Sequence, residues 1–120
     1  MDSDDILDKN ALYKLFFRAE KDSLDMICFD GRSFVDDDLE GTVSAAIDYY
    51  IRSAKYNGVY TGVELLSLMQ KNGDYRTSVP LQMVKKSFLE ENNIHFVNGI
   101  LHEDNLYTYQ CMIMAKRVVH

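Results

Sequence analysis

Two histidines near the C-terminal end have the spacing that a metal site or a pH switch requires. Asn98-Gly99 between two apolar runs predicts a tight β-turn, and its register would place His95 directly opposite His102. Two imidazoles about 5 Å apart can bind a divalent cation with a third ligand such as Cys111, or repel each other once protonated. Zinc sites have three or four ligands at recognisable spacings, and neither CxxC nor HxxxH occurs. We therefore expect a surface pair, with no metal and no other cofactor.

The other candidates for covalent chemistry are the two cysteines. Cys28 and Cys111 fall in apolar or alternating segments, where a thiol packs as a small hydrophobic side chain. An activated thiolate prefers a helix N-terminus or an electropositive pocket, so a pair of Cys111 with a histidine is a weak candidate. The chain has no GxSxG, GxxxxGK[ST] or GxGxxG motif. The sequence favours a protein without enzymatic activity, although scattered carboxylates leave no linear signature and keep a cryptic enzyme open.

Charge is distributed unevenly along the chain. Residues 1–50 hold 13 of the 19 acids and 5 of the 13 bases, a net charge of −8, whereas residues 51–120 carry +2. An acidic surface repels phosphate backbones and attracts basic proteins, and separated charge speeds their association. The asymmetry predicts a binding surface for a basic protein partner. The alternative is a solvated surface that only maintains solubility.

We predict that acids of the N-terminal half bind this partner together with a tyrosine stripe on the helix that follows them. Arg52 lies three residues after Tyr49 and four before Tyr56, which places all three side chains on one helix face. Tyrosine supplies a large contact area at low entropy cost, although such rings also flank protein cores with their hydroxyls in water. The predicted partner-binding residues are Asp36, Asp37, Asp38, Glu40, Asp48, Tyr49, Arg52 and Tyr56.

Length and composition set the frame for these residues. A chain of 120 residues, 47% of them hydrophobic, predicts one folded domain over residues 1–120. Its apolar runs are far shorter than the roughly 20 residues that cross a bilayer. The acidic N-terminus lacks the basic region of a signal peptide. We expect a cytoplasmic protein that binds no membrane and keeps both cysteines reduced.

The elements that position these residues are predicted from periodicity and turn signals. Apolar spacings of three and four predict helices at about 4–21, 37–57, 61–72 and 78–92, with Asn10 as an alternative start of the first. Asp-Gly and Asn-Gly pairs predict antiparallel β-hairpins at 26–35 and 94–103. Tyrosine, threonine and isoleucine predict a C-terminal strand over 106–115, a segment that a helix would also fit. Because helices and strands do not alternate, we predict an α+β domain with an antiparallel sheet.

Two function classes follow from this arrangement. Three helices and a hairpin are also the order of a winged helix, with 78–92 as recognition helix and Asn98-Gly99 at the wing tip. Its bases are few, chiefly Lys85 and Lys86, and acids follow the wing, so we expect no nucleic-acid binding. In size, acidity and lack of catalytic motifs the chain is similar to the cognate inhibitors with which bacteria neutralise their own toxins. We therefore favour an inhibitor or immunity protein, an antitoxin for a basic partner such as a toxin nuclease. A phage-encoded inhibitor or an adaptor would show the same features.

Overall fold

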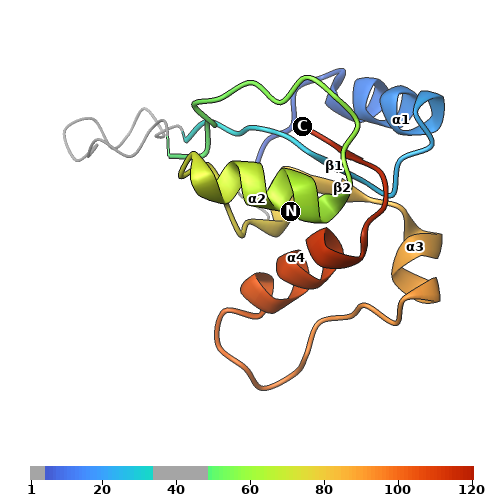
Figure 1. Cartoon of the computed structure of the whole chain (residues 1–120), viewed down its shortest axis with the longest axis vertical. Coiled ribbons are helices and arrows are strands. Elements are labelled where there is room, and N and C mark those ends of the chain that lie inside the picture. The colour runs from blue at the N-terminus through green and yellow to red at the C-terminus, as the bar shows by residue number, and fades with distance from the viewer. Residues whose placement is uncertain (1–4, 34–48) are drawn as a thin grey trace.

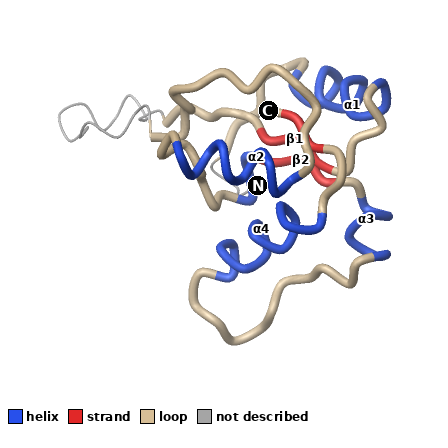
Figure 2. Tube along the Cα trace, viewed as in Figure 1, coloured by secondary structure: helices blue, strands red, loops and turns tan. Residues whose placement is uncertain are grey.

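A small sheet with helices on both faces forms the protein, which confirms the predicted α+β class. The sheet is mixed and not antiparallel as predicted, because one of its two strand pairs is parallel. The computed structural model describes residues 5–33 and 49–120. In chain order its elements are α1 (Ala11–Lys21), β1 (Met26–Cys28), α2 (Gly62–Lys71), a 3₁₀ turn (Val79–Leu81), β2 (Gln82–Val84), α3 (Lys86–Glu91), α4 (Glu103–Met114) and β3 (Val118–Val119). Long connections join these short elements (Figure 2). None of the helices in this part of the chain combines the length and apolar character that a bilayer crossing requires.

Strand β1 lies at the centre of the sheet, whose strand order is β2-β1-β3. It pairs antiparallel with β2, Ile27 opposite Met83, and parallel with β3, Ile27 opposite Val119. Beyond β3, Tyr60 adds an antiparallel bridge to Val118 through two backbone hydrogen bonds of 2.8 and 2.9 Å. Both edges of β1 are therefore occupied by segments that are distant in the sequence.

The alternation of β1 divides the core into two clusters. Met26 and Cys28 pack with Val118 against α2 and α4 in the larger cluster. Ile27 and Val119 face the other way and pack with Leu24 under α1. Figure 1 shows α1 on one side of the strands and α2 with α4 on the other. A strand with period two can thus be buried on both faces because helices cover both.

Helix α2 begins as the sequence predicts. The Thr61 hydroxyl accepts from the Glu64 backbone N–H, and the Glu64 carboxylate accepts from the Thr61 N–H at 2.8 Å. This capping box satisfies two donors that the first turn leaves unpaired. The first residue of the helix, Gly62, lies against α4: a Cβ built there would sit 1.8 Å from the carbonyl oxygen of Met112. Only glycine therefore permits this close approach of α2 to α4.

Predictions for the N-terminal half are corrected in three places. Helix α1 begins at Ala11, so the predicted start near residue 4 is wrong and the alternative at Asn10, its N-cap residue, is right. The 26–35 hairpin is wrong in its described part, because β1 pairs with β2 and β3 and residues 29–33 form no strand. Of the predicted 37–57 helix, residues 37–48 lie outside the described residues. Residues 49–57 are turns and loop, stabilised by contacts from other segments.

Predictions for the C-terminal half differ more. The segment 78–92 contains the 3₁₀ turn, β2 and α3, because its apolar residues also satisfy a strand beside β1. Asn98-Gly99 is a turn, but residues 94–97 and 100–102 are not strands, so the 94–103 hairpin and the His95–His102 strand pairing are wrong. The predicted strand 106–115 is α4, which buries Tyr107, Cys111 and Met112 at helical spacing. With neither recognition helix nor wing, the winged-helix prediction is also wrong.

Gly62→Ala should destabilise the fold by about 3 kcal/mol, because the added methyl group forces α2 away from the backbone of α4. Urea denaturation followed by circular dichroism measures this change. Val63→Ala, at an exposed neighbouring position of the same helix, should change stability by less than about 0.5 kcal/mol. Equal stability of the two variants would contradict the close contact at Gly62.

Candidate protein-binding surface

Residues 36–48, termed here the acidic segment, contain the five acids predicted to bind the partner. Tyr49 and Tyr50 follow this segment directly in the sequence and are the first residues that the structure describes after it. Their side chains are 56% and 36% exposed, and the two rings meet edge to face with centroids 4.9 Å apart. The Arg76 guanidinium lies 4.5 Å from the centre of the Tyr49 ring, within the range of a cation–π contact. Arg76 Nε also donates to the Tyr49 carbonyl oxygen at 2.7 Å. Arg76 therefore fixes the position of the exposed tyrosine pair through its two contacts with Tyr49.

Arg76 is itself fixed by the loop that leaves α2. Its Nη1 donates to the carbonyl oxygens of Gly73 at 2.7 Å and Tyr75 at 3.1 Å. Gly73 has a positive φ of 69°, which lets the chain turn sharply after the helix and present its carbonyl oxygen. The guanidinium therefore joins the end of α2 to the tyrosine pair.

Arg52 turns inward and is buried. Its Nη1 donates to the Phe29 carbonyl oxygen at 2.7 Å and to Asp30 Oδ1 at 3.0 Å. The Arg52 backbone N–H donates to the same carboxylate oxygen, and His120 Nε2 lies 3.0 Å from it. Asp30, two residues after the end of β1, therefore connects this strand to both Arg52 and His120. This ion pair, buried on the Arg52 side and open to solvent on the Asp30 side, holds the segment that carries Tyr49 against the sheet.

Tyr56 is buried as well and belongs to a cluster around Asp74. The Tyr56 hydroxyl donates to Asp74 Oδ2 at 2.7 Å. Both the backbone N–H and the hydroxyl of Ser53 donate to Oδ1 at 2.9 Å, and the Ala54 N–H donates to Oδ2 at 3.0 Å. Burial alone would raise the pKa of Asp74, but these four hydrogen bonds outweigh it and hold the pKa well below its ordinary value. Asp74 is thus a charged anchor for residues 53–56.

The predicted partner-binding residues have different fates. Asp36, Asp37, Asp38, Glu40 and Asp48 lie outside the described residues. Tyr49 is exposed, whereas Arg52 and Tyr56 are 7% and 5% exposed. The common helix face predicted for the three is wrong, because residues 49–57 are not helical. The geometry places Arg52 and Tyr56 beneath the surface, where they bind the carboxylates of Asp30 and Asp74.

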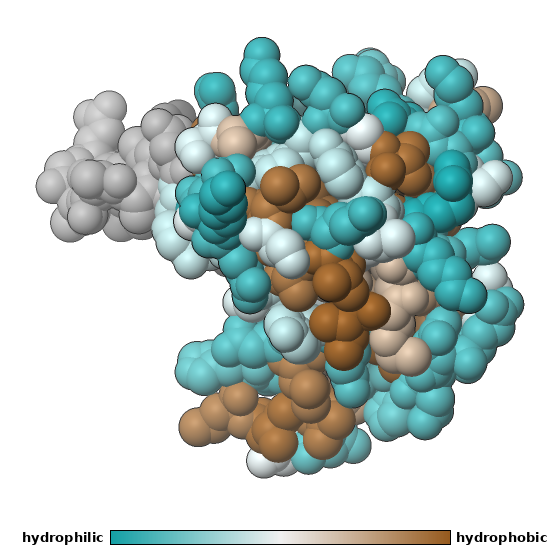
Figure 3. Space-filling view, viewed as in Figure 1, coloured by the Kyte–Doolittle hydropathy of each residue, from teal (hydrophilic) through white to brown (hydrophobic). Residues whose placement is uncertain are grey.

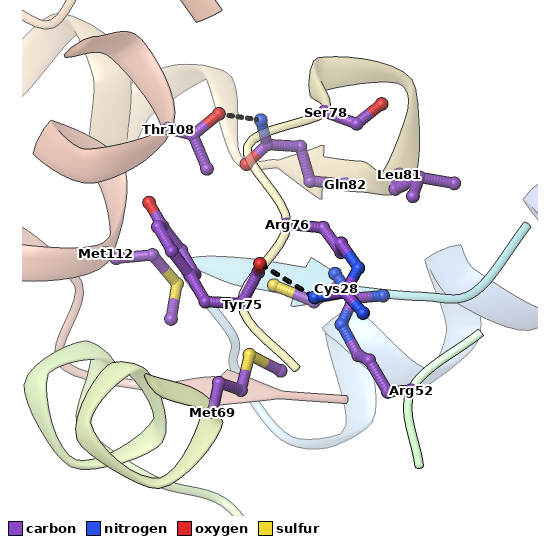
Figure 4. Close-up of a pocket in the computed structure, with 10 residues that line it drawn as sticks. All are labelled: Cys28, Arg52, Met69, Tyr75, Arg76, Ser78, Leu81, Gln82, Thr108 and Met112. Carbon is purple, nitrogen blue, oxygen red and sulfur yellow. Dashed lines mark hydrogen bonds between the residues drawn. The ribbon is translucent and has the colours of Figure 1, made fainter. Parts of the chain in front are cut away.

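A small cavity lies behind this segment, at the junction of β1, α2 and α4. Figure 4 shows the side chains of Arg52 and Arg76 pointing toward one another in its lining. Three buried polar atoms of its lining residues make no hydrogen bond: Arg52 Nε, the Tyr75 hydroxyl oxygen and Gln82 Oε1. The cavity measures about 10 Å³, the space of one water molecule. It has no room for an organic substrate.

Neither the two thiols nor the Ser53 hydroxyl is arranged as an activated nucleophile. Burial raises the pKa of both thiols, Cys28 and Cys111, to about 11, which keeps them protonated at neutral pH. Ser53 bonds to Asp74 while His120 contacts Asp30, so serine, histidine and acid are not in series. Within residues 5–33 and 49–120 no three histidine, cysteine or acidic residues form a metal-binding group.

Sequence reasoning missed the three residues that hold the surface in place: Asp74, Arg76 and His120. A single signal pointed to Asp74: it is an acid that directly follows the Asn72-Gly73 helix stop. Comparison with known proteins adds no further residue, since no family model, curated protein or solved structure matches this chain. The geometry of the described residues therefore carries the functional argument.

Asp74→Asn should destabilise the protein by about 3 kcal/mol, because a neutral amide replaces a carboxylate that accepts four hydrogen bonds. The pKa of Asp74 is lowered in the folded state, so its contribution is complete above the unfolded pKa of about 4. That contribution is lost as pH falls below this value. Urea denaturation between about pH 7 and pH 3 should show a falling free energy of unfolding for the wild type and a flatter acid limb for the variant.

The matched control is Glu91→Gln, which removes one acid from an exposed position at the end of α3. It should leave both the stability at neutral pH and the acid limb close to those of the wild type. An Asp74→Asn variant as stable as this control would show that the hydrogen bonds to Asp74 do not anchor residues 53–56.

Proposed function

We propose that this protein is a non-enzymatic binding module that engages a basic protein partner through its acidic segment, with Tyr49 as the aromatic anchor. The observation that carries the proposal is the exposed Tyr49–Tyr50 pair, fixed by Arg76 directly after that segment in the sequence. Asp36, Asp37, Asp38, Glu40 and Asp48 supply the charge. Arg52 and Tyr56 lie beneath and support the contact.

Fixing an exposed tyrosine before binding favours affinity. An interface side chain that is still free loses roughly 0.5–1.5 kcal/mol of rotamer entropy on binding. The cation–π contact and the hydrogen bond from Arg76 restrict Tyr49 in the free protein. Tyrosine is also among the residues that contribute most at interface centres. The pair therefore suits an anchor better than an arbitrary surface ring.

Charge supports the choice of a basic partner. The net charge of −8 over residues 1–50 steers a cationic protein toward this half of the chain and raises the association rate. A basic nuclease cleft, which binds phosphates, fits such a surface. The module then acts as an inhibitor of immunity type: it covers the cleft and excludes the nucleic acid.

The proposal predicts association kinetics governed by charge. The partner, captured from host extract with the immobilised chain and then purified, is mixed with the free chain in a stopped-flow instrument. Raising salt from low to physiological should slow association at least about fivefold. Neutralising Asp36, Asp37 and Asp38 to Asn should lower the association rate, whereas Tyr49→Ala should mainly raise the dissociation rate.

The control is Glu20→Gln with Glu90→Gln and Glu91→Gln, which removes the same three charges from other parts of the chain. It should slow association less than the aspartate variant, because steering depends on where the charge lies. An association rate that does not change with salt concentration would refute the role proposed for the acidic surface. Equal slowing of association by the two triple variants would refute it as well. If the partner is a nuclease, its cleavage of a labelled oligonucleotide should stop at one equivalent of the chain.

A further inference from the structure

Helix α1 carries an exposed apolar surface that the core does not use. Only Leu15 and Ala19 of this helix pack against the small core cluster. The surface, termed here the α1 ridge, consists of side chains that are 52% to 65% exposed: Leu12, Tyr13, Phe16 and Phe17. Three of its rings contact one another, with centroids 4.3 Å and 5.7 Å apart. Such a contiguous aromatic surface is typical of a binding site.

Basic residues border the α1 ridge. Lys14 follows Tyr13 directly and lies three residues before Phe17, and Lys21 lies four residues after Phe17. Both lysines are exposed. Arg18, the third base of the helix, pairs with the C-cap residue Asp22. Glu20, three residues after Phe17, is exposed as well, so the border of the apolar ridge carries two exposed lysines and one exposed acid, a net charge of +1.

A second apolar surface lies at the opposite end of the molecule. An open groove of about 400 Å³ runs between the loop after α2 and the first turns of α4 and has an apolar surface. It is termed the α4 groove and is lined by Tyr75, Thr77, Asn105, Leu106 and Tyr109. Ile113, one turn beyond Tyr109, is 44% exposed and extends its apolar wall. In Figure 3 a further group of apolar atoms gathers at the lower end of the molecule, over the connection that leads into α4 and outside the groove lining.

The charge beside the α4 groove is acidic. Helix α4 begins with Glu103 and Asp104, the two residues that precede the groove residues Asn105 and Leu106. Arg76, between Tyr75 and Thr77, is engaged with the Tyr49 ring and three carbonyl oxygens. The free charge at this rim therefore complements the lysines of the α1 ridge.

We infer that the α4 groove of one molecule receives the α1 ridge of a second copy of this chain. One surface is an aromatic helix with a net basic border and the other an apolar groove with an acidic border, so the two are complementary in polarity and in charge.

The contact forms between molecules and not within one. Helices α1 and α4 lie on opposite sides of the strands and at opposite ends of the molecule (Figure 1). In the inferred arrangement the contact is heterologous: every copy offers one ridge and one groove, and association continues beyond a dimer unless a ring closes. The inference does not depend on the proposed function, and its test uses the chain alone.

Sedimentation velocity of two blocked variants and their mixture tests this arrangement. The wild type should associate as concentration rises, to species larger than a dimer. Phe16→Asp blocks the ridge and Leu106→Asp blocks the groove, and each alone should weaken association by more than about tenfold, because a carboxylate would be buried in an apolar contact. An equimolar mixture should form a dimer and nothing larger, since one intact ridge then meets one intact groove.

Three further variants separate this contact from misfolding and from general stickiness. Both blocked positions are exposed, and far-UV circular dichroism should show native helix content. Val63→Asp places the same charge on an exposed apolar position of α2 and should associate as the wild type does. Lys14→Glu leaves the apolar ridge intact and should still weaken association, and Glu103→Lys in the partner copy should restore it.

Several results would overturn the inference. One is a wild-type protein that stays monomeric at every concentration. A monomer whose α1 ridge binds vesicles of anionic lipid would overturn the inference in the same way. Another is a mixture of the blocked variants that stays monomeric while the wild type associates, which would indicate a symmetric contact. Association retained by Phe16→Asp alone would remove the ridge from the interface.

Discussion

The fold depends on burying a central strand of only three residues on all sides. Met26–Cys28 has helices on both faces and needs a neighbour at each edge, because an unpaired backbone group inside a protein costs about as much as a lost hydrogen bond. Those neighbours, β2 and β3, come from the later half and the very end of the chain. Asp25 closes the arrangement: its carboxylate accepts from the backbone N–H groups of Lys116 and Arg117, and its carbonyl oxygen accepts from the Lys85 N–H. The chain must therefore close long loops before this sheet is stable.

This constraint explains which elements the sequence could predict. Helix α2 was predicted almost to the residue, because its capping box and its glycine stop are local interactions. Strands β2 and β3 were missed, since two or three residues show no periodicity and their pairing is decided by β1. Helix α4 was assigned as a strand because its residue types favour strands, although the spacing of Tyr107, Cys111 and Met112 is helical. Tertiary burial overrode propensity there, as it did in the segment that contains β2.

In the candidate surface, too, the sequence predicted what depends on local features and not what depends on contacts between distant segments. The exposure of Tyr49 agrees with its predicted role, which depended on residue type and on the acids before it. The inward positions of Arg52 and Tyr56 depend on Asp30, His120 and Asp74, residues far away in the sequence that no spacing rule connects to them. Spacings of three and four place Tyr49, Arg52 and Tyr56 on one face only if the segment is helical. Residues 49–57 are not helical and are held by hydrogen bonds to other segments. A buried arginine is therefore the feature that reasoning from local pattern was least able to find.

The two interaction surfaces proposed for this chain depend on different forces, but both include the loop of residues 75–77. Association at the acidic segment is controlled by long-range charge, whereas contact between the α1 ridge and the α4 groove depends on apolar area and on concentration. Tyr75 and Thr77 line the groove, and Arg76 between them holds the Tyr49 ring. A helix seated in the groove therefore packs against the same loop that fixes the tyrosine anchor. Coupling between the two sites would require that loop to differ between its occupied and empty states, because a ligand shifts an equilibrium only through a difference in its affinity for two conformations. The three carbonyl contacts of Arg76 make the loop stiff, which favours two surfaces that work independently.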